Sequence, residues 1–195
     1  MKRAFMFLSR SGAGKDTQAD FLREYLGADR TLSISTGDPM RALADQRDLL
    51  AGRYVAEKAT GPGNRAPAFI AVWAWAERMI HEFTPEKETV IFEGSPRTIL
   101  EAQVLDEVFP FFEIKKVYPL WLDITAEEAR KRLLGRHRKD DNEPAIERRL
   151  AYYERDVVPI LHYYQGESAY RLIKIDCMVP REEVFEQIKQ AISSM

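Results

Sequence analysis

The chain has 195 residues, of which 45% are hydrophobic and 31% are charged, and its formal net charge is −2. This length and composition predict one globular domain with a sizeable core and room for small inserted units. Because the net charge is close to zero, composition gives no reason to expect binding to nucleic acid or to a membrane surface. A site for an anion would have to be local.

The number of cysteines and the length of the apolar runs give an expectation for the cellular location of the protein. A single cysteine, Cys177, cannot form a disulfide within the chain and is typical of a reducing environment. The apolar run at 4–8 is too short for the core of a signal peptide, and no run reaches the roughly 18 residues of a membrane span. We therefore expect a cytoplasmic protein. The sequence leaves both a monomer and an oligomer open.

Short apolar runs alternate along the chain with stretches of 3.6-residue periodicity. The runs predict strands at 4–8, 31–35, 89–93, 117–123 and 172–176. The periodic stretches predict helices at 14–26, 39–51, 68–83, 98–108, 125–134, 144–164 and 181–193. This alternation is typical of an α/β fold, here a five-stranded parallel sheet with helices on both faces. Ligands of such sheets bind beyond the carboxyl ends of the strands.

Two of the predicted helices have clear apolar faces. The helix at 68–83 should bury Phe69, Val72, Trp73, Ala76, Met79 and Ile80. Trp75 lies off this stripe, and we expect it to serve in packing or in a subunit contact rather than to stack on a base. The helix at 144–164 should bury Ile146, Leu150, Tyr153, Val157, Ile160 and Tyr164. Pro159 should kink this second helix.

The stretch LSRSGAGKDTQ at 8–18 is close to a phosphate-binding loop, G-x-x-x-x-G-K-[ST]. It follows a predicted strand and opens a predicted helix, which is the context that such a loop requires. Gly12, Ala13 and Gly14 would form the turn, and Lys15 would reach the β- and γ-phosphates of a nucleoside triphosphate. The alternative is a glycine-rich turn with a solvated lysine.

This loop departs from its consensus at two positions. Ser9 stands in place of the leading glycine, and Asp16 stands in place of the hydroxyl residue. Thr17 is then the nearest hydroxyl for Mg²⁺ or for a phosphate. The Asp16 carboxylate would repel phosphates unless it faces a metal shell or a neighbouring cation.

Further stretches make the chain similar to the adenylate kinase family of nucleoside monophosphate kinases. They are ISTGDPMR at 34–41, FEGSPRTILEAQ at 92–103, RKDDNEPAIERRLAYYERDVVPILHYY at 138–164 and IDCMVPREEV at 175–184. The resemblance covers most of the chain and is weakest at 53–80. It implies a P-loop NTPase core at 1–35, 81–134 and 144–195, a flap that binds the nucleoside monophosphate at 36–80, and a very short lid at 135–143.

The resemblance also implies residues for the acceptor. Thr36 would lie near the acceptor base, Arg41 and Arg97 would hold the acceptor phosphate, and Gly94 would lie beside them. In support, Arg97 follows a predicted strand end and would project from the same sheet edge as Lys15. An ordinary helix cap at Thr36, with a solvated Arg41, is the alternative.

Glu93 stands where the family has an aspartate at a strand end. We expect it to order water around Mg²⁺, which would be held mainly through water and phosphates near Thr17 and Glu93. A capping or structural carboxylate is the alternative reading of Glu93.

The stretch RKRLLGRHRKDD at 130–141 is strongly basic, and by default it would be a solvated face. The family places Arg132 and Arg136 on the donor, ATP, and it places Arg138 and Arg149 between donor and acceptor. Phosphoryl transfer explains such a cluster, because negative charge spreads over the three equatorial oxygens and the protein supplies mainly position and counter-charge. A monophosphate acceptor is largely dianionic at neutral pH and needs no general base.

The base of the acceptor depends on Glu101. The family has a glutamine at this position, which can both donate to and accept from adenine, whereas a carboxylate only accepts and would suit the donors of guanine. We expect AMP first and GMP second, followed by UMP/CMP or a deoxynucleotide. A nucleotide-binding regulator with weakened catalysis is the alternative from another class.

Overall fold

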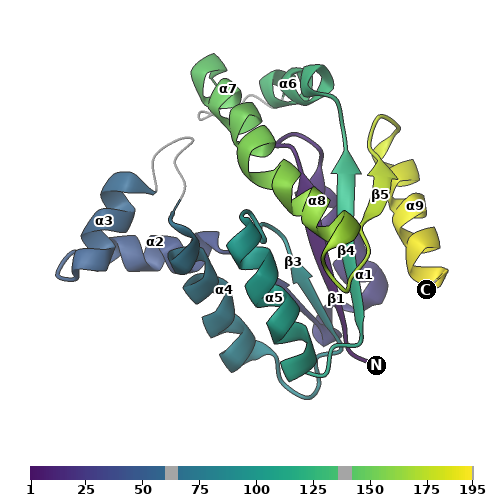
Figure 1. Ribbon diagram of the computed structural model, residues 1–195, viewed down its shortest axis with the longest axis horizontal. Coiled ribbons are helices and arrows are strands. Elements are labelled where there is room, and N and C mark those ends of the chain that lie inside the picture. Colours follow the sequence, from purple (N-terminus) through teal and green to yellow (C-terminus); the bar gives the residue numbers. More distant parts are fainter. Residues whose placement is uncertain (60–65, 136–141, 195) are drawn as a thin grey trace.

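The computed structural model describes residues 1–59, 66–135 and 142–194. Within this part of the chain, five strands form one sheet in the order β2-β3-β1-β4-β5 (Figure 1). The strands are β1 (Arg3–Ser9), β2 (Thr31–Ile34), β3 (Thr89–Phe92), β4 (Lys116–Asp123) and β5 (Ile173–Asp176). Every pairing is parallel. The predicted fold class is therefore confirmed.

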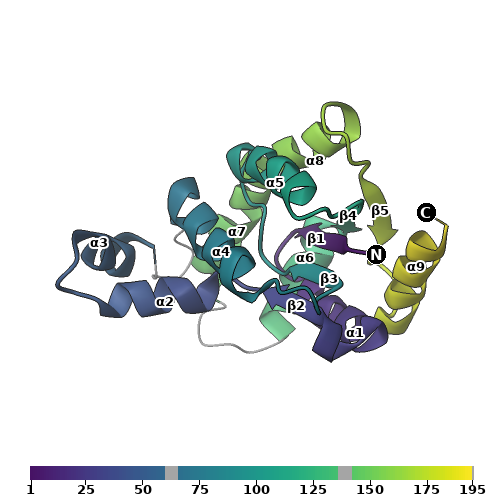
Figure 2. The same cartoon turned by 90° about the horizontal axis from the view of Figure 1, so that it is seen from below.

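Helices pack on both faces of the sheet, and two of them, α2 (Gly37–Asp45) and α3 (Leu50–Lys58), project from its edge (Figure 1). They are α1 (Lys15–Leu26), η1 (Ala28–Arg30), α2 (Gly37–Asp45), α3 (Leu50–Lys58), α4 (Ala68–Glu82), α5 (Ile99–Phe111), α6 (Ala126–Gly135), α7 (Glu143–Tyr152), η2 (Tyr153–Val157), α8 (Val158–Gly166) and α9 (Arg181–Ser193). Figure 2 shows α5 and α8 on one side of the sheet and α1 and α9 on the other.

The central strand β1 divides its side chains between two apolar clusters. Met6 and Leu8 pack with α4, α5 and α8 on one face. Phe5 and Phe7 pack with α1, α6 and α9 on the other face. Successive side chains of a strand point to opposite faces, so a strand buried on both sides must be apolar throughout. This is why the run at 4–8 is uninterrupted.

The predicted helix at 39–51 is wrong, because two helices occupy this region. α2 ends at Asp45 and α3 begins at Leu50. A Cβ on Gly52 would lie 2.0 Å from the carbonyl oxygen of Gln46, so the chain folds back more closely than any side chain at that position allows. Figure 1 shows α2 and α3 projecting from the edge of the sheet, and Leu43, Ala44, Val55 and Ile70 form a small separate core.

The predicted buried stripe of α4 is also wrong at three of its six positions, while Met79 is buried and Val72 and Ala76 pack partly buried against the core. Phe69 and Ile80 are each 68% exposed and Trp73 is 40% exposed. The buried residues are Ile70, Ala71, Ala74, Trp75 and Met79. Because α4 is apolar around most of its circumference, periodicity could not select the face that packs. The packing role expected for Trp75 is confirmed, since its ring is fully buried and lies edge-on to Phe92.

The long helix near the C-terminus follows its prediction. All six residues of its expected apolar face are buried. Its middle, η2, is a π-helical segment that ends just before Val158 and Pro159. Proline lacks an N–H and its ring crowds the carbonyl group four residues earlier, so a wider turn relieves this crowding. The irregularity lies where Pro159 predicts it.

A carboxylate holds α8 against α5. Asp106 accepts hydrogen bonds from the hydroxyl groups of Tyr163 at 2.8 Å, Tyr164 at 3.2 Å and Ser168 at 2.6 Å. Burial and the neighbouring Asp106 raise the pKa of Tyr163 to about 12. This group of bonds fixes the end of α8 before the chain enters β5.

We expect Asp106→Asn to lower the free energy of unfolding at pH 7 by about 1–3 kcal/mol, because three hydroxyl groups lose a charged acceptor. A tyrosine whose pKa is raised by folding stabilises the protein below pH about 10, and this contribution is lost as the pH rises toward 12. Urea titrations should therefore show a shallower alkaline loss of stability in the variant. Glu107→Gln, an exposed position on the same helix, is the control, and equal stability of both variants would contradict the prediction.

Candidate active site

The loop between β1 and α1 has the backbone of an anion-binding turn. Gly12 and Gly14 have φ of +94° and +86°, which favours glycine. A Cβ on Gly12 would lie 2.8 Å from the carbonyl oxygen of Ala129 on α6. α1 begins at Lys15, so the free N–H groups of its first turn and the lysine lie together. This is the arrangement expected from the sequence.

Lys15 forms an ion pair with its neighbour Asp16. Both side chains border a pocket at the carboxyl ends of the strands, whereas Gly12, Ala13 and Thr17 do not. An exposed ion pair of this kind is worth about 0–1 kcal/mol. A nucleotide phosphate could therefore replace the carboxylate at Lys15 at little cost.

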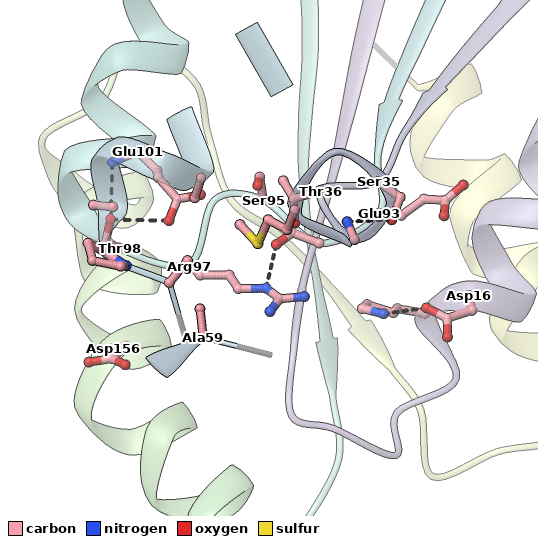
Figure 3. Close-up of a pocket in the computed structure, with 18 of the residues that line it drawn as sticks. Asp16, Ser35, Thr36, Ala59, Glu93, Ser95, Arg97, Thr98, Glu101 and Asp156 are labelled. Carbon is pink, nitrogen blue, oxygen red and sulfur yellow. Dashed lines mark hydrogen bonds and ion pairs between the residues drawn. The ribbon is translucent and has the colours of Figure 1, made fainter. Parts of the chain in front are cut away.

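A pocket of about 590 Å³ lies beyond the carboxyl ends of β1, β2 and β3 (Figure 3). This volume is in the range of small-molecule sites. The start of α1 contributes Lys15 and Asp16. The segment after β2 contributes Ser35 and Thr36, and α2 contributes Gly37 and Met40. The segment after β3 contributes Glu93, Gly94, Ser95, Arg97 and Thr98, and α5 contributes Glu101. Ala59, Ala66, Pro67, Ala68 and Ala71 close one side, and Arg155 and Asp156 of η2 complete the wall.

Most of the residues expected on the acceptor side meet in this pocket. Thr36, Gly94, Arg97 and Glu101 all border it. The Nε of Arg97 donates to the carbonyl oxygen of Gly94 at 2.5 Å, which holds the guanidinium over the pocket floor (Figure 3). Arg41 does not border the pocket. Its exposed side chain forms an ion pair with Asp38.

The residues expected on the donor are only partly within the described chain. Arg132 of α6 donates through Nη2 to the carbonyl oxygen of Cys177 at 2.9 Å, so it lies against the loop after β5. Arg149 is half-buried on α7 and does not border the pocket. Arg136 and Arg138 lie outside the described residues, as does most of the proposed lid.

Several pocket residues were not anticipated from the sequence, and two of them, Arg155 and Asp156, are charged. Arg155 binds Asp156 through both ends of its guanidinium, at 2.7 and 2.8 Å, and both residues face the pocket from η2. No local pattern marks them, since they fall within a helical stretch. The π-helical turn changes the direction of the side chains that follow it, and Pro159 is the only sequence signal for that turn.

The end of β3 has an electrostatic environment that suits a divalent cation. Burial raises the pKa of the Glu93 carboxyl, and repulsion from Asp16 and Asp20 raises it further, while the Ser33 hydroxyl and Lys15 oppose the shift. Carboxylate oxygens are ligands that Mg²⁺ prefers, and a cation would relieve this repulsion. Within the described residues, no group of three or more histidine, cysteine or acidic side chains could hold a metal by itself. Phosphate oxygens would have to complete the coordination.

Similarity to known proteins identifies the family of this chain. A family model described as adenylate kinase matches residues 7–170. The chain belongs to the adenylate kinase family. It is 31% identical to an adenylate kinase of Leptospira biflexa, over 98% of this chain and 100% of that protein. It is 32% identical to adenylate kinase 1 of Synechocystis sp., over 98% of both chains, and 30% identical to an adenylate kinase of Thermus thermophilus, over 97% of both. The predicted family and enzyme class, a phosphotransferase of the nucleoside monophosphate kinase type, are confirmed.

We expect Gly12→Ala to lower the free energy of unfolding by about 1–3 kcal/mol, because alanine is strained at this φ and its Cβ meets Ala129. ATP affinity, measured by calorimetry, should fall with it as the turn shifts. Gly166→Ala, at the exposed end of α8, is the matched control, since a Cβ there has nothing within 4 Å. Equal stability and affinity of the two variants would show that the turn tolerates a side chain.

Glu93→Gln should raise the stability of the free protein but weaken its binding of Mg²⁺. Because the pKa of the carboxyl is raised in the folded protein, stability falls as the pH rises from the ordinary carboxyl pKa through the raised one and stays lower above it, so the neutral amide should stabilise the free protein at pH 7. The same change should weaken Mg²⁺ binding to the complex with ATP. In the parent, Mg²⁺ affinity should fall when the pH is lowered through the raised pKa, and in Glu93→Gln this part of the pH dependence should be absent. Unchanged Mg²⁺ affinity in the variant would remove Glu93 from the metal site.

Proposed function

We propose that the protein is an adenylate kinase that transfers the γ-phosphate of ATP to AMP, reversibly and with Mg²⁺, to give two ADP. The observation that best supports the proposal is that Lys15 of the phosphate loop and Arg97 of the β3–α5 loop border the same pocket. The names of the relatives, which match over nearly the whole chain, support AMP ahead of GMP, UMP/CMP or a deoxynucleotide.

On the donor side, the backbone N–H groups around Gly14 and the ammonium of Lys15 would bind the phosphates of ATP. Arg132 would lie along the base, which is consistent with its bond to the loop after β5. Arginine faces stack on any base, so this contact places the donor without selecting it strongly. Arg136 would join Lys15 on the donor phosphates.

On the acceptor side, Arg97 would hold the phosphate of AMP beside Gly94, and Thr36 and Glu101 would lie along the base. Arg41 would leave Asp38 and turn toward the same phosphate. Arg138 and Arg149 would reach the transferring group between the two nucleotides. The flap at 36–80 and the lid at 135–143 remain proposals, and they would close over the pocket.

The chain needs no general base for this reaction. An oxygen of the AMP phosphate, already dianionic, attacks the γ-phosphorus of ATP, and the bond from that phosphorus to the β-bridging oxygen breaks. The cationic side chains neutralise the charge that spreads over the equatorial oxygens. Mg²⁺, when bound, would neutralise the β- and γ-phosphates, and Glu93 and Asp16 or Thr17 would orient its water ligands. Closure would keep water from competing as the acceptor.

The proposal also includes the cellular location of the protein and its binding partners. Within residues 1–59, 66–135 and 142–194, no helix combines the length and hydropathy needed to cross a membrane. We keep the cytoplasm as the proposed location, on the grounds of the single cysteine. ATP and AMP are the proposed partners, and the oligomeric state stays open.

A coupled assay should test AMP, GMP, UMP and CMP, each with ATP and with GTP. We expect ATP with AMP to give the highest kcat/KM. Lys15→Ala should lower it about 10²–10³-fold, because a cation that stabilises the transition state is lost. Lys115→Ala, an exposed lysine that precedes β4 at the opposite edge of the sheet, should leave it unchanged. ATP binding without turnover on any acceptor would instead indicate a regulator.

A further inference from the structure

Arg10 is an arginine within the phosphate loop whose side chain does not border the pocket. It is the first residue after β1, at a position that the consensus of such loops leaves open. Its backbone carbonyl oxygen accepts from the N–H of Ala13 at 3.3 Å, and Gly12, at the third position of this turn, has φ of +94°. This is the pattern of a type II turn. Arg10 therefore begins the turn that would bind the phosphates.

Three contacts join the side chain of Arg10 to elements outside the loop. Its Nε donates to the carbonyl oxygen of Ile124, just after β4, at 3.1 Å. Its guanidinium lies over the ring of Tyr153, 3.9 Å from the centroid, and its Nη1 forms an ion pair with Glu154. Tyr153 and Glu154 belong to η2. One side chain thus connects the loop to the end of β4 and to η2.

These three contacts require a guanidinium group. A guanidinium is planar, so its edges can donate to different acceptors while its face stacks on an aromatic ring. An ammonium on lysine could approach the carboxylate or the ring, but it has no separated donors with which to reach Ile124 and Glu154 together. Only 18% of the Arg10 side chain is exposed, so solvent screens these interactions less than those of a surface ion pair.

The surfaces that Arg10 contacts are held in place without it. Tyr153 is 4% exposed, and its hydroxyl oxygen accepts from Nε1 of Trp121 on β4 at 3.1 Å. On the other side of the loop, Gly12 packs closely against Ala129 of α6. Figure 1 shows the loop between α6 and the helix that runs from α7 to α8. The loop is therefore the part whose position depends on Arg10.

We propose that Arg10 is a positioning residue that holds the phosphate loop against β4 and η2 in the shape that binds ATP. The inference rests on the proposed function, since it takes ATP as the ligand of this loop. A loop that is ordered before binding has less conformational freedom to lose when the ligand arrives, so it binds more tightly. Because Arg10 does not border the pocket, the affinity for AMP should depend on it little.

Calorimetry on the full chain can compare the two nucleotides. We expect Arg10→Ala to bind ATP, with Mg²⁺ present, about tenfold or more weakly than the parent, because the loop must be ordered at the expense of binding. The affinity for AMP should stay within about twofold of the parent, since the pocket wall keeps its own contacts. A residue that only supported the fold would affect both nucleotides alike.

Hydrogen exchange measures the order of the loop without any nucleotide. In Arg10→Ala, the amides of residues 11–15 should exchange about tenfold or more faster than in the parent, because local opening becomes easier. The amides of β1, β4 and α8 should keep their rates. ATP at saturation should reduce the difference between the two proteins. An increase of similar size along the whole chain would indicate general destabilisation and overturn the inference.

Glu154→Gln tests whether the ion pair acts through Arg10. The Glu154 side chain is 60% exposed, so its change should weaken ATP binding by no more than about fivefold. In the Arg10→Ala background the same change should have no further effect, since its partner is already absent. A weakening that persists in this background would mean that the carboxylate acts without Arg10, and it would overturn the inference.

Arg171→Ala is the matched control. Arg171 is exposed and precedes β5, at the opposite edge of the sheet, so this variant should match the parent in both measurements. If Arg10→Ala does not fold, Arg10→Lys takes its place, with an expected loss of ATP affinity of about threefold because the charge is kept and the separated donors are lost.

The outcomes separate this inference from the proposed function. Unchanged ATP affinity in the Arg10 variant, or an equal loss of ATP and AMP affinity, would overturn the inference and leave the kinase proposal intact. A parent that binds ATP but phosphorylates no nucleotide would overturn only the kinase proposal. Exchange in the free protein decides the inference even if the parent does not bind ATP.

Discussion

All five strands run in the same direction, so the loops that follow β1, β2 and β3 end at one edge of the sheet. Residues separated by more than eighty positions in sequence, such as Lys15 and Arg97, therefore share a pocket. The glycine turn against Ala129 fixes the first of these loops. Helix starts at this edge add partial positive charge. The proposed site for two nucleotides depends on this shared direction.

Charge balance explains why the described pocket needs further cations. Among the described residues that border it, Lys15, Arg97 and Arg155 face Asp16, Glu93, Glu101 and Asp156. Two nucleotides would add several negative charges to a wall that is already slightly acidic. Mg²⁺ at Glu93 and the arginines predicted at 136, 138 and 149 would supply the missing counter-charge. The charge balance of the described pocket residues therefore supports the proposal that Mg²⁺ and these arginines take part in binding.

Two of the carboxylates stand at positions where the consensus or the family has a neutral side chain. Asp16 pairs with Lys15, and Glu101 borders the pocket. Each carboxylate adds negative charge to a pocket that the phosphates of a nucleotide would enter. The shared physical consequence is that phosphate binding in this pocket depends more strongly on cations than it would with amide or hydroxyl groups at these two positions.

Local patterns in the sequence determined the five strands, the phosphate loop, the buried face of α7 to α8 and the position of Arg97 after β3, because each depends on residues close together in the chain. Tertiary packing alone decided the rest. α4 is apolar on several sides, so contact with β3 and α5, rather than periodicity, selected Trp75 over Trp73 for burial. The turn around Gly52 split one expected helix into two. η2 brought Arg155 and Asp156 into the pocket, and Asp38 held Arg41 outside it. Such choices depend on which surfaces meet in space, and no short stretch of sequence contains that information.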